Sequence, residues 1–168
     1  MKFLPIENIT YQTKLKEEDI IHRLLKNTEP KKMFRFGSGS TKPYEGEIDE
    51  KTFSIRRIIR SKNSFLPQIK GQIEKEYYST IICVKMRLRL SVIIFLCFWC
   101  GCVGFICMLI IFMILTKSLE SSEFPVGAII PFGMLLFAYG LTMVSFKTES
   151  NKSKKYLKEL FEADIIEE

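Results

Sequence analysis

Cysteine spacing is the first feature of the chain that could do chemistry. The stretch CFWCGC contains Cys97, Cys100 and Cys102, and Cys107 follows one more helical turn along. A C-x-x-C spacing suits a redox pair or a zinc site, but both require the thiolate form. The neighbouring residues are apolar and include no Lys, His or Arg, so forming a thiolate there is costly. We therefore expect no metal and no cofactor at these cysteines.

Helix packing is the alternative use of the same residues. Cys97 with Gly101, and Cys100 with Gly104, form pairs of small residues four positions apart. Such pairs allow two helices to approach closely within a membrane. We expect these four residues to pack against another helix.

Three further motifs could suggest catalysis, and each has a simpler explanation. GSGSTK at 37–42 resembles a phosphate loop, but Lys42 precedes Pro43 and an expected strand instead of a helix. His22 is the single histidine, so neither a Ser-His-Asp triad nor a multi-His zinc site has a second histidine to use. Glu45 and Glu47 alternate along an expected strand, which favours solvent exposure. The sequence predicts no catalytic residues and a protein that is not an enzyme.

Basic residues are concentrated on either side of the CFWCGC stretch, and seven of them are candidates for binding. These candidate headgroup contacts are Arg56, Arg57, Arg60, Lys62, Lys85, Arg87 and Arg89. One interpretation is an orientation signal for membrane insertion, and the other is contact with anionic lipid headgroups. Either explains the net charge of +6 without a nucleic-acid partner.

Two long apolar segments must position these residues. No formal charge occurs in residues 90–116 or in residues 124–146. As helices they would extend about 40 Å and about 35 Å, enough for a hydrocarbon core of about 30 Å. The sequence predicts two transmembrane helices that form a hairpin, joined by a short external loop at 117–123.

Charges near the two segments predict their orientation, because cytoplasmic flanks are enriched in Lys and Arg. The flanking basic residues are Lys75, Lys85, Arg87, Arg89, Lys147, Lys152, Lys154, Lys155 and Lys158, whereas the connecting loop has Lys117 with Glu120 and Glu123. We expect both termini in the cytoplasm. Neither apolar segment contains an ionisable residue, which argues against an ion pathway within one chain.

The remaining residues predict an α+β domain. Residues 16–27 have helical spacing of apolar residues, and from 44 to 88 the period changes to two, which indicates four strands in an antiparallel meander. Residues 147–168 indicate a terminal amphipathic helix, with Ser150 or Ser153 near its start, packing on the 44–88 sheet. The transmembrane hairpin would then be inserted between the cytoplasmic domain of residues 1–89 and this terminal helix. The loop at 63–67, NSFLP, either folds inward or contacts lipid or a partner.

FSIRRIIRSKNSFLPQIKGQI, followed by IICVKMRLRLSVIIFLCFW, resembles a group of small uncharacterised bacterial membrane proteins. Their pattern is close to F-x-I-x-R-I-I-x-Y-R-N-S-F-L-P-x-I-x-G, and the match covers roughly Gly46 to Trp99. Ser61 and Lys62 replace Tyr-Arg, and a frequent His-Pro is missing at the start of the first span. The resemblance implies a two-span protein of the bacterial inner membrane. It does not indicate any particular activity.

These features predict a non-enzymatic integral membrane protein whose cytoplasmic domain is an interaction or anionic-lipid-surface module. The alternative is an accessory subunit of a larger transport or envelope complex, and an oligomeric pore is a further alternative. The expected partners are the lipid bilayer with its anionic headgroups, and a membrane protein or a second copy of the chain.

Overall fold

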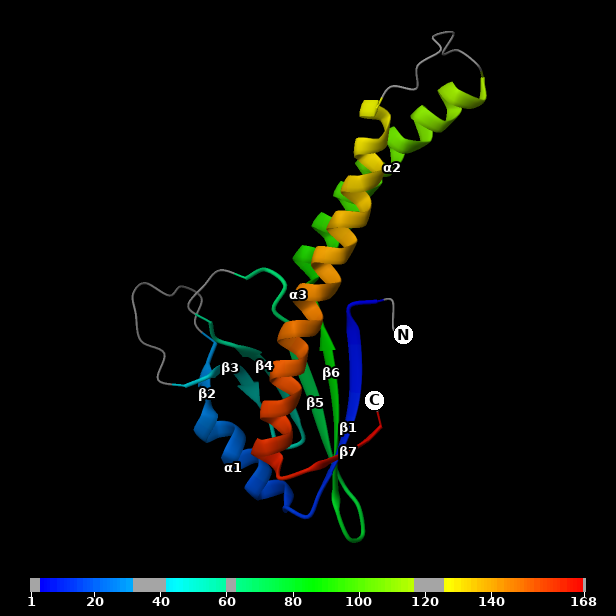
Figure 1. Ribbon diagram of the computed structural model, residues 1–168. Helices are drawn as coiled ribbons and strands as arrows, with labels where there is room; N and C mark the ends of the chain where they lie inside the picture. The colour runs from blue at the N-terminus through cyan, green and yellow to red at the C-terminus, as the bar shows by residue number, and fades with distance from the viewer. Residues whose placement is uncertain (1–3, 32–41, 60–62, 117–125, 168) are drawn as a thin grey trace. The chain divides into compact units, whose positions relative to one another are not determined.

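The computed structural model describes residues 4–31, 42–59, 63–116 and 126–167. The chain divides into two compact units, which are described separately here (Figure 1). The sheet unit consists of Met1–Arg89 and Ser145–Glu168, and the helical unit consists of Leu90–Val144. One helix, α3 (Ile130–Phe161), contributes residues to both units.

The sheet unit is built on a mixed sheet of seven strands in the order β2-β3-β4-β5-β6-β1-β7. Their bounds are β1 Ile6–Thr13, β2 Thr28–Pro30, β3 Tyr44–Ile48, β4 Thr52–Arg57, β5 Gln68–Lys75, β6 Thr80–Arg87 and β7 Asp164–Glu167. Strands β2 and β3 are parallel, and the other neighbours are antiparallel. The α+β class is confirmed. The expected four-stranded meander is too small, because β3 to β6 are the centre of a larger sheet.

The terminal helix expected at 147–168 is present as far as Phe161, but it is not a separate helix. Helix α3 continues from the second apolar segment to Phe161 without a break, because no proline or glycine follows Gly140 within it. Ser150 and Ser153, expected near a helix start, lie in its interior with 0% exposure. The helix ends where Glu162 adopts a positive φ of 47°, and residues 164–167 then form β7.

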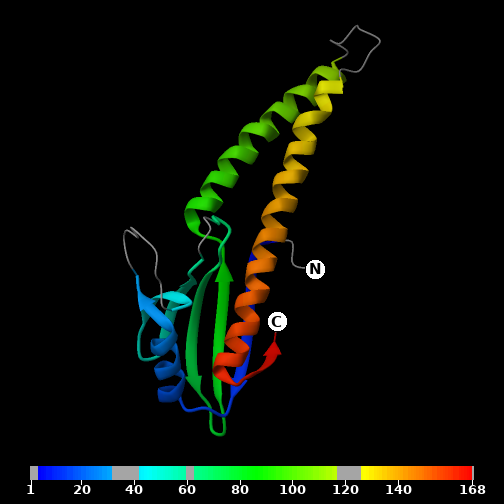
Figure 2. The same cartoon turned by 60° about the vertical axis from the view of Figure 1, so that its left-hand side comes forward.

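One face of the sheet is covered by α1 (Glu17–Asn27) and by the part of α3 in the sheet unit (Figure 2). Strict alternation of burial along β5 and β6 identifies this face, as expected for a sheet with one buried side. The largest fully buried side chains are Tyr11, Phe146, Phe161, Ile9, Ile20, Leu24, Ile55, Ile69, Ile73, Ile82, Met86 and Leu157. The two helices are joined to each other by Arg23, whose Nη1 donates to the Leu160 carbonyl at 3.0 Å.

A close packing of aromatic rings forms the centre of this core. Phe161 lies 6.0 Å from Tyr11 and 6.1 Å from Phe53, measured between ring centroids. The Phe53 ring in turn lies over Gly71 on β5, where a Cβ atom would fall on the ring itself. Glycine at this position of the strand is therefore required by the close approach of Phe53.

The helical unit contains α2 (Leu90–Leu115), the 3-10 helix η1 (Val126–Ile129) and the first part of α3. The apolar windows of the two long helices have mean hydropathies of 2.7 and 1.9, and both helices are long and apolar enough to cross a membrane. Large apolar side chains on them are exposed, including Phe98, Phe112 and Leu136. The expected hairpin of two transmembrane helices does not match these helices fully, because α3 continues well beyond the second apolar segment.

Candidate functional site

The face of the sheet opposite α1 and α3 carries a group of basic side chains among the described residues. Burial alternates along the strands, so the residues between the core positions point to this open face. We define the basic face as Arg56 on β4, Lys70 on β5, and Lys85 and Arg87 on β6. The two lysines and Arg87 are exposed, and Arg56 is partly exposed.

Strand register places the two lysines directly opposite each other. Lys70 pairs with Lys85 across β5 and β6, and Gln68 pairs with Arg87 two positions further on. Side chains at opposite positions of an antiparallel pair have Cβ atoms about 5 Å apart, and like charges there destabilise the sheet. The sheet therefore holds a repulsive pair that an anion would relieve.

The residues around this pair provide hydrogen-bond donors but no compensating carboxylate. Ser54 lies opposite Lys70 on β4, and Asn8 lies opposite Lys85 on β1. Lys70, Lys85 and Arg87 form no ion pair with any residue that the structure describes. Arg56 differs, because it donates two hydrogen bonds to Glu45 on β3. Glu45 is only 5% exposed, so its expected solvent exposure is wrong.

The basic face lies at one end of the sheet, and this is the end where the chain leaves for α2. Strand β6 ends at Arg87, and α2 begins three residues later at Leu90. The other segment of the sheet unit begins at the same end, because Glu149 and Ser150 of α3 contact Arg57 and Glu7 there. At the opposite end, the β5–β6 turn carries Tyr77 and Tyr78, which are 98% and 96% exposed.

The structure separates the seven basic residues predicted to bind headgroups. It places Arg56, Lys85 and Arg87 on the basic face, and Arg89 is exposed just beyond β6. Arg57 lies on the covered face, where its Nη1 is 3.1 Å from Glu149 Oε2. Arg60 and Lys62 lie outside the described residues. Lys70 was missed, because its closeness to Lys85 depends on a register that alternation alone does not give.

A buried polar cluster lies between α3 and the sheet. Ser150 Oγ donates to the Glu7 carboxylate, and the Tyr11 hydroxyl donates to the Lys154 carbonyl at 3.2 Å. Burial raises the pKa of Tyr11 and also that of Tyr44 above the ordinary value of a tyrosine. Both phenols therefore stay neutral near pH 7 and act as hydrogen-bonding groups. Ser150 is 0% exposed and Glu7 is 9% exposed, so their hydrogen bond lies inside the core of the sheet unit.

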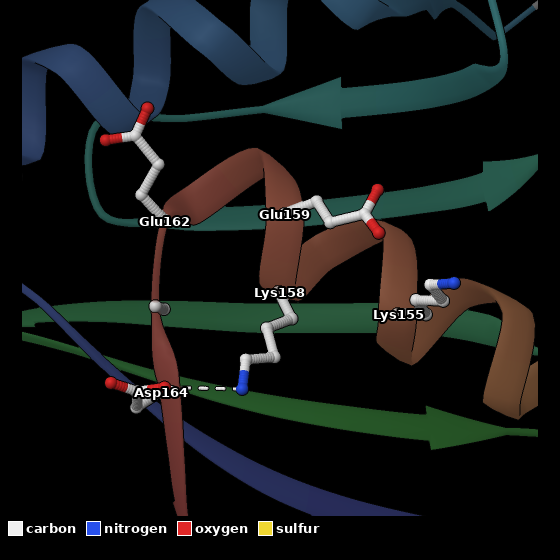
Figure 3. A pocket seen from close by; sticks show the side chains of 6 residues that line it. Lys155, Lys158, Glu159, Glu162 and Asp164 are labelled. Atoms are coloured by element: carbon white, nitrogen blue, oxygen red, sulfur yellow. Dashed lines mark ion pairs between the residues drawn. The ribbon is translucent and has the colours of Figure 1, made fainter.

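The described residues also provide no group of three or more His, Cys, Asp or Glu side chains that could hold a metal. A hollow of about 490 Å³ at the end of α3 is lined by Lys155, Lys158, Glu159, Glu162, Ala163 and Asp164. Lys158 reaches across to Asp164, 3.2 Å from Nζ to Oδ1 (Figure 3). The basic and acidic side chains that line this hollow are mixed and exposed. They are more typical of a solvated surface than of a site for a charged ligand.

The residues predicted for helix packing lie on α2. Cys97 and Gly101 are exposed, and Cys100 and Gly104 are partly buried. The buried residues of α2 are instead Val103 and Cys107. A Cβ atom added at Gly101 or Gly104 would meet nothing within 4 Å among the described residues. Packing of these small residues against another helix remains a prediction.

Comparisons of the chain with protein-family models, curated proteins and solved structures find no match. The resemblance of residues 46–99 to the two-span membrane proteins therefore stays a prediction. The basic face is the feature of the structure that bears most directly on function.

Proposed function

We propose that the chain is a non-enzymatic integral membrane protein whose sheet unit contacts anionic lipid headgroups through the basic face. The observation that carries the proposal is the register of Lys70 with Lys85, two exposed like charges with no carboxylate partner among the described residues. Like charges directly opposite each other destabilise a sheet, so this pair does not stabilise the fold. An anionic membrane surface would supply the negative charge that these two lysines lack.

Two apolar helices support the membrane location, and chain continuity supports the contact with headgroups. Arg87 and Arg89 precede the first residue of α2 by three positions and one position. Residues so close to a membrane span lie within reach of the headgroup layer. We place the protein in the bacterial inner membrane with both termini in the cytoplasm, where anionic lipids and the positive-inside bias act together.

The size of the effect follows from the number of uncompensated cations. Each Lys or Arg near an anionic leaflet contributes about 1 kcal/mol of attraction. Lys70, Lys85 and Arg87 together would contribute about 3 kcal/mol, enough to orient an attached domain. The attraction weakens with salt, since exposed charges are screened over about 8 Å at physiological ionic strength.

An accessory subunit of a larger membrane complex is the second candidate function. It is favoured by Gly101 of α2, which is exposed and has open space on its side of the helix. A subunit of this kind would bring a partner in fixed stoichiometry when purified in mild detergent. A chain purified alone would favour the lipid-surface function.

Lysine footprinting tests the proposed contact directly. In nanodiscs with anionic lipid, acylation of Lys70 and Lys85 should be about fivefold slower than in zwitterionic nanodiscs, because bound headgroups shield the amines. Lys51 and Lys75, at the opposite end of the sheet, serve as internal controls and should react equally in both lipids. High salt should restore the reaction of Lys70 and Lys85. Equal rates for all four lysines in both lipids would contradict the proposal.

Thiol labelling tests the orientation. A cysteine introduced by Ser121→Cys should react with an impermeant reagent in intact cells, because residue 121 is expected in the external loop. The exposed thiol of Cys83 provides the matched internal control, since it belongs to the sheet unit and should react only after the membrane is opened. Labelling of Cys83 in intact cells, with residue 121 protected, would reverse the orientation.

A further inference from the structure

We infer that the basic face binds one lipid headgroup that carries at least two negative charges, such as a phosphomonoester or a pair of linked phosphodiesters. This inference rests on the proposed function, and it names the class of lipid. It distinguishes a discrete site from general attraction to a charged surface.

The number of unpaired positive charges favours a headgroup with more than one negative charge. Lys70, Lys85 and Arg87 are exposed and form no ion pair with a described residue, so three positive charges are uncompensated in one place. A headgroup with a single charge would leave two of them unneutralised. A headgroup with two or more charges neutralises most of the group and relieves the repulsion between the opposed lysines.

The spacing of the three basic side chains suits a single phosphate group. Lys70 and Lys85 are opposite each other, and Arg87 is two residues further along β6 on the same face. Two residues along a strand correspond to about 7 Å, and opposed Cβ atoms are about 5 Å apart. Long side chains from these three positions can converge on one phosphate group, with the guanidinium binding two of its oxygens and the ammonium groups acting as point charges.

Polar but neutral side chains border the three cations. Asn8, Ser54 and Gln68 surround the cations at neighbouring register positions, and Gln68 Nε2 lies 3.5 Å from Ser54 Oγ. These side chains can hydrogen-bond the ester and hydroxyl oxygens of a headgroup without adding charge. The acids on this face lie further away: Glu47 is two strands from Lys70, beyond Ser54, and Glu74 is four residues along β5, away from the α2 end.

Chain continuity favours lipid over a soluble phosphate as the source of this anion. Arg87 is three residues from the first residue of α2, so the headgroups of a bilayer crossed by α2 would be concentrated within a short length of chain from it. A tethered ligand has a high effective concentration, whereas a soluble phosphate must be captured from solution.

Native mass spectrometry of the full chain in detergent tests the inference by counting bound lipids. Three lipids with identical acyl chains are compared: phosphatidate with a phosphomonoester, phosphatidylglycerol with one charge, and zwitterionic phosphatidylcholine. We expect the first phosphatidate to bind about fivefold more tightly than the first phosphatidylglycerol, the effect of one further neutralised cation. The variant Lys70→Gln/Lys85→Gln should lose this difference. The control Lys51→Gln/Lys75→Gln removes the same amount of charge at the other end of the sheet. This control should keep the preference for phosphatidate over phosphatidylglycerol.

Each outcome has a distinct meaning. Equal binding of phosphatidate and phosphatidylglycerol, with both above phosphatidylcholine, would overturn the discrete site and leave the proposed function intact. Equal binding of all three lipids would overturn both. Glycerol phosphate added without lipid should fail to bind at concentrations that saturate with phosphatidate, and tight binding of it would make the ligand a soluble phosphate.

A charge-reversal variant separates binding from folding. Lys85→Glu places a carboxylate opposite Lys70 and converts the repulsive pair into an ion pair. Its thermal unfolding temperature should equal or exceed that of the parent, while the preference for phosphatidate should disappear. A preference that survives in this folded variant would overturn the site.

Discussion

Replacing Phe161 by alanine should lower the free energy of unfolding of the sheet unit by about 3–5 kcal/mol. The side chain is 0% exposed, and its ring contacts both Tyr11 of β1 and Phe53 of β4. Removal leaves a cavity between three elements that are far apart in the sequence. The loss could exceed half the stability of a domain of this size.

Pulse proteolysis of the full chain in urea measures this change, because cleavage of residues 1–89 reports the unfolded fraction. Leu25→Ala is a matched control, since Leu25 is an apolar helix residue of the same unit that is 51% exposed. It should cost less than about 1 kcal/mol. If Phe161→Ala cost no more than Leu25→Ala, the aromatic packing would not contribute to stability.

The same contact explains why the sheet unit needs its two separated segments. Leu157 and Phe161 are both fully buried, yet they follow the apolar part of α3 in the sequence. Thr13 Oγ1 donates to the Phe161 carbonyl at 2.7 Å, which attaches the end of α3 to the end of β1. The core is therefore completed only after the chain has passed through both apolar helices.

Much of the secondary structure was predictable because its signals are local. Acidic residues in the first turn and helical spacing of Ile20 and Leu24 identify α1. The alternation of apolar residues in β5 and β6 gives both the strands and their buried face. The apolar segments stand out by length alone.

The larger sheet was not predictable, because its outer strands depend on partners far along the chain. Strand β1 pairs with β6 over its full length, from Ile6 with Arg87 to Thr13 with Thr80. Two of its inward positions are the polar residues Glu7 and Thr13, which obscure the apolar alternation. Strands β2 and β7 have three and four residues, too few for any period to be visible.

The candidate site was predictable where it depends on alternation along one strand, and not where it depends on contacts between distant residues. Alternation along β6 places Lys85 and Arg87 together on one face. Arg56 and Arg57 are neighbours, so alternation must send them to opposite faces, but it cannot say which one faces the helices. Contact of Arg57 with Glu149 decides this, and Glu149 is 92 residues away. The opposition of Lys70 and Lys85 also requires the register, which only the sheet provides.

Gly71→Ala should destabilise the sheet unit by about 3 kcal/mol, although alanine adds a single methyl group. That methyl group would fall on the Phe53 ring, which is packed against Phe161 and is only 3% exposed. Gly101→Ala is the matched control, because a Cβ there meets nothing within 4 Å, and the sheet unit should unfold as in the parent.

A double-mutant cycle separates this clash from a general intolerance of β5. Phe53→Leu alone should cost about 1–2 kcal/mol, because a smaller side chain leaves part of the core unfilled. In the double variant the shortened side chain makes room for the new methyl group, so the two changes together should cost at least 1 kcal/mol less than their sum. Pulse proteolysis in urea gives all four values. Additive costs would show that Gly71 is needed for its backbone and not for the space that Phe53 occupies.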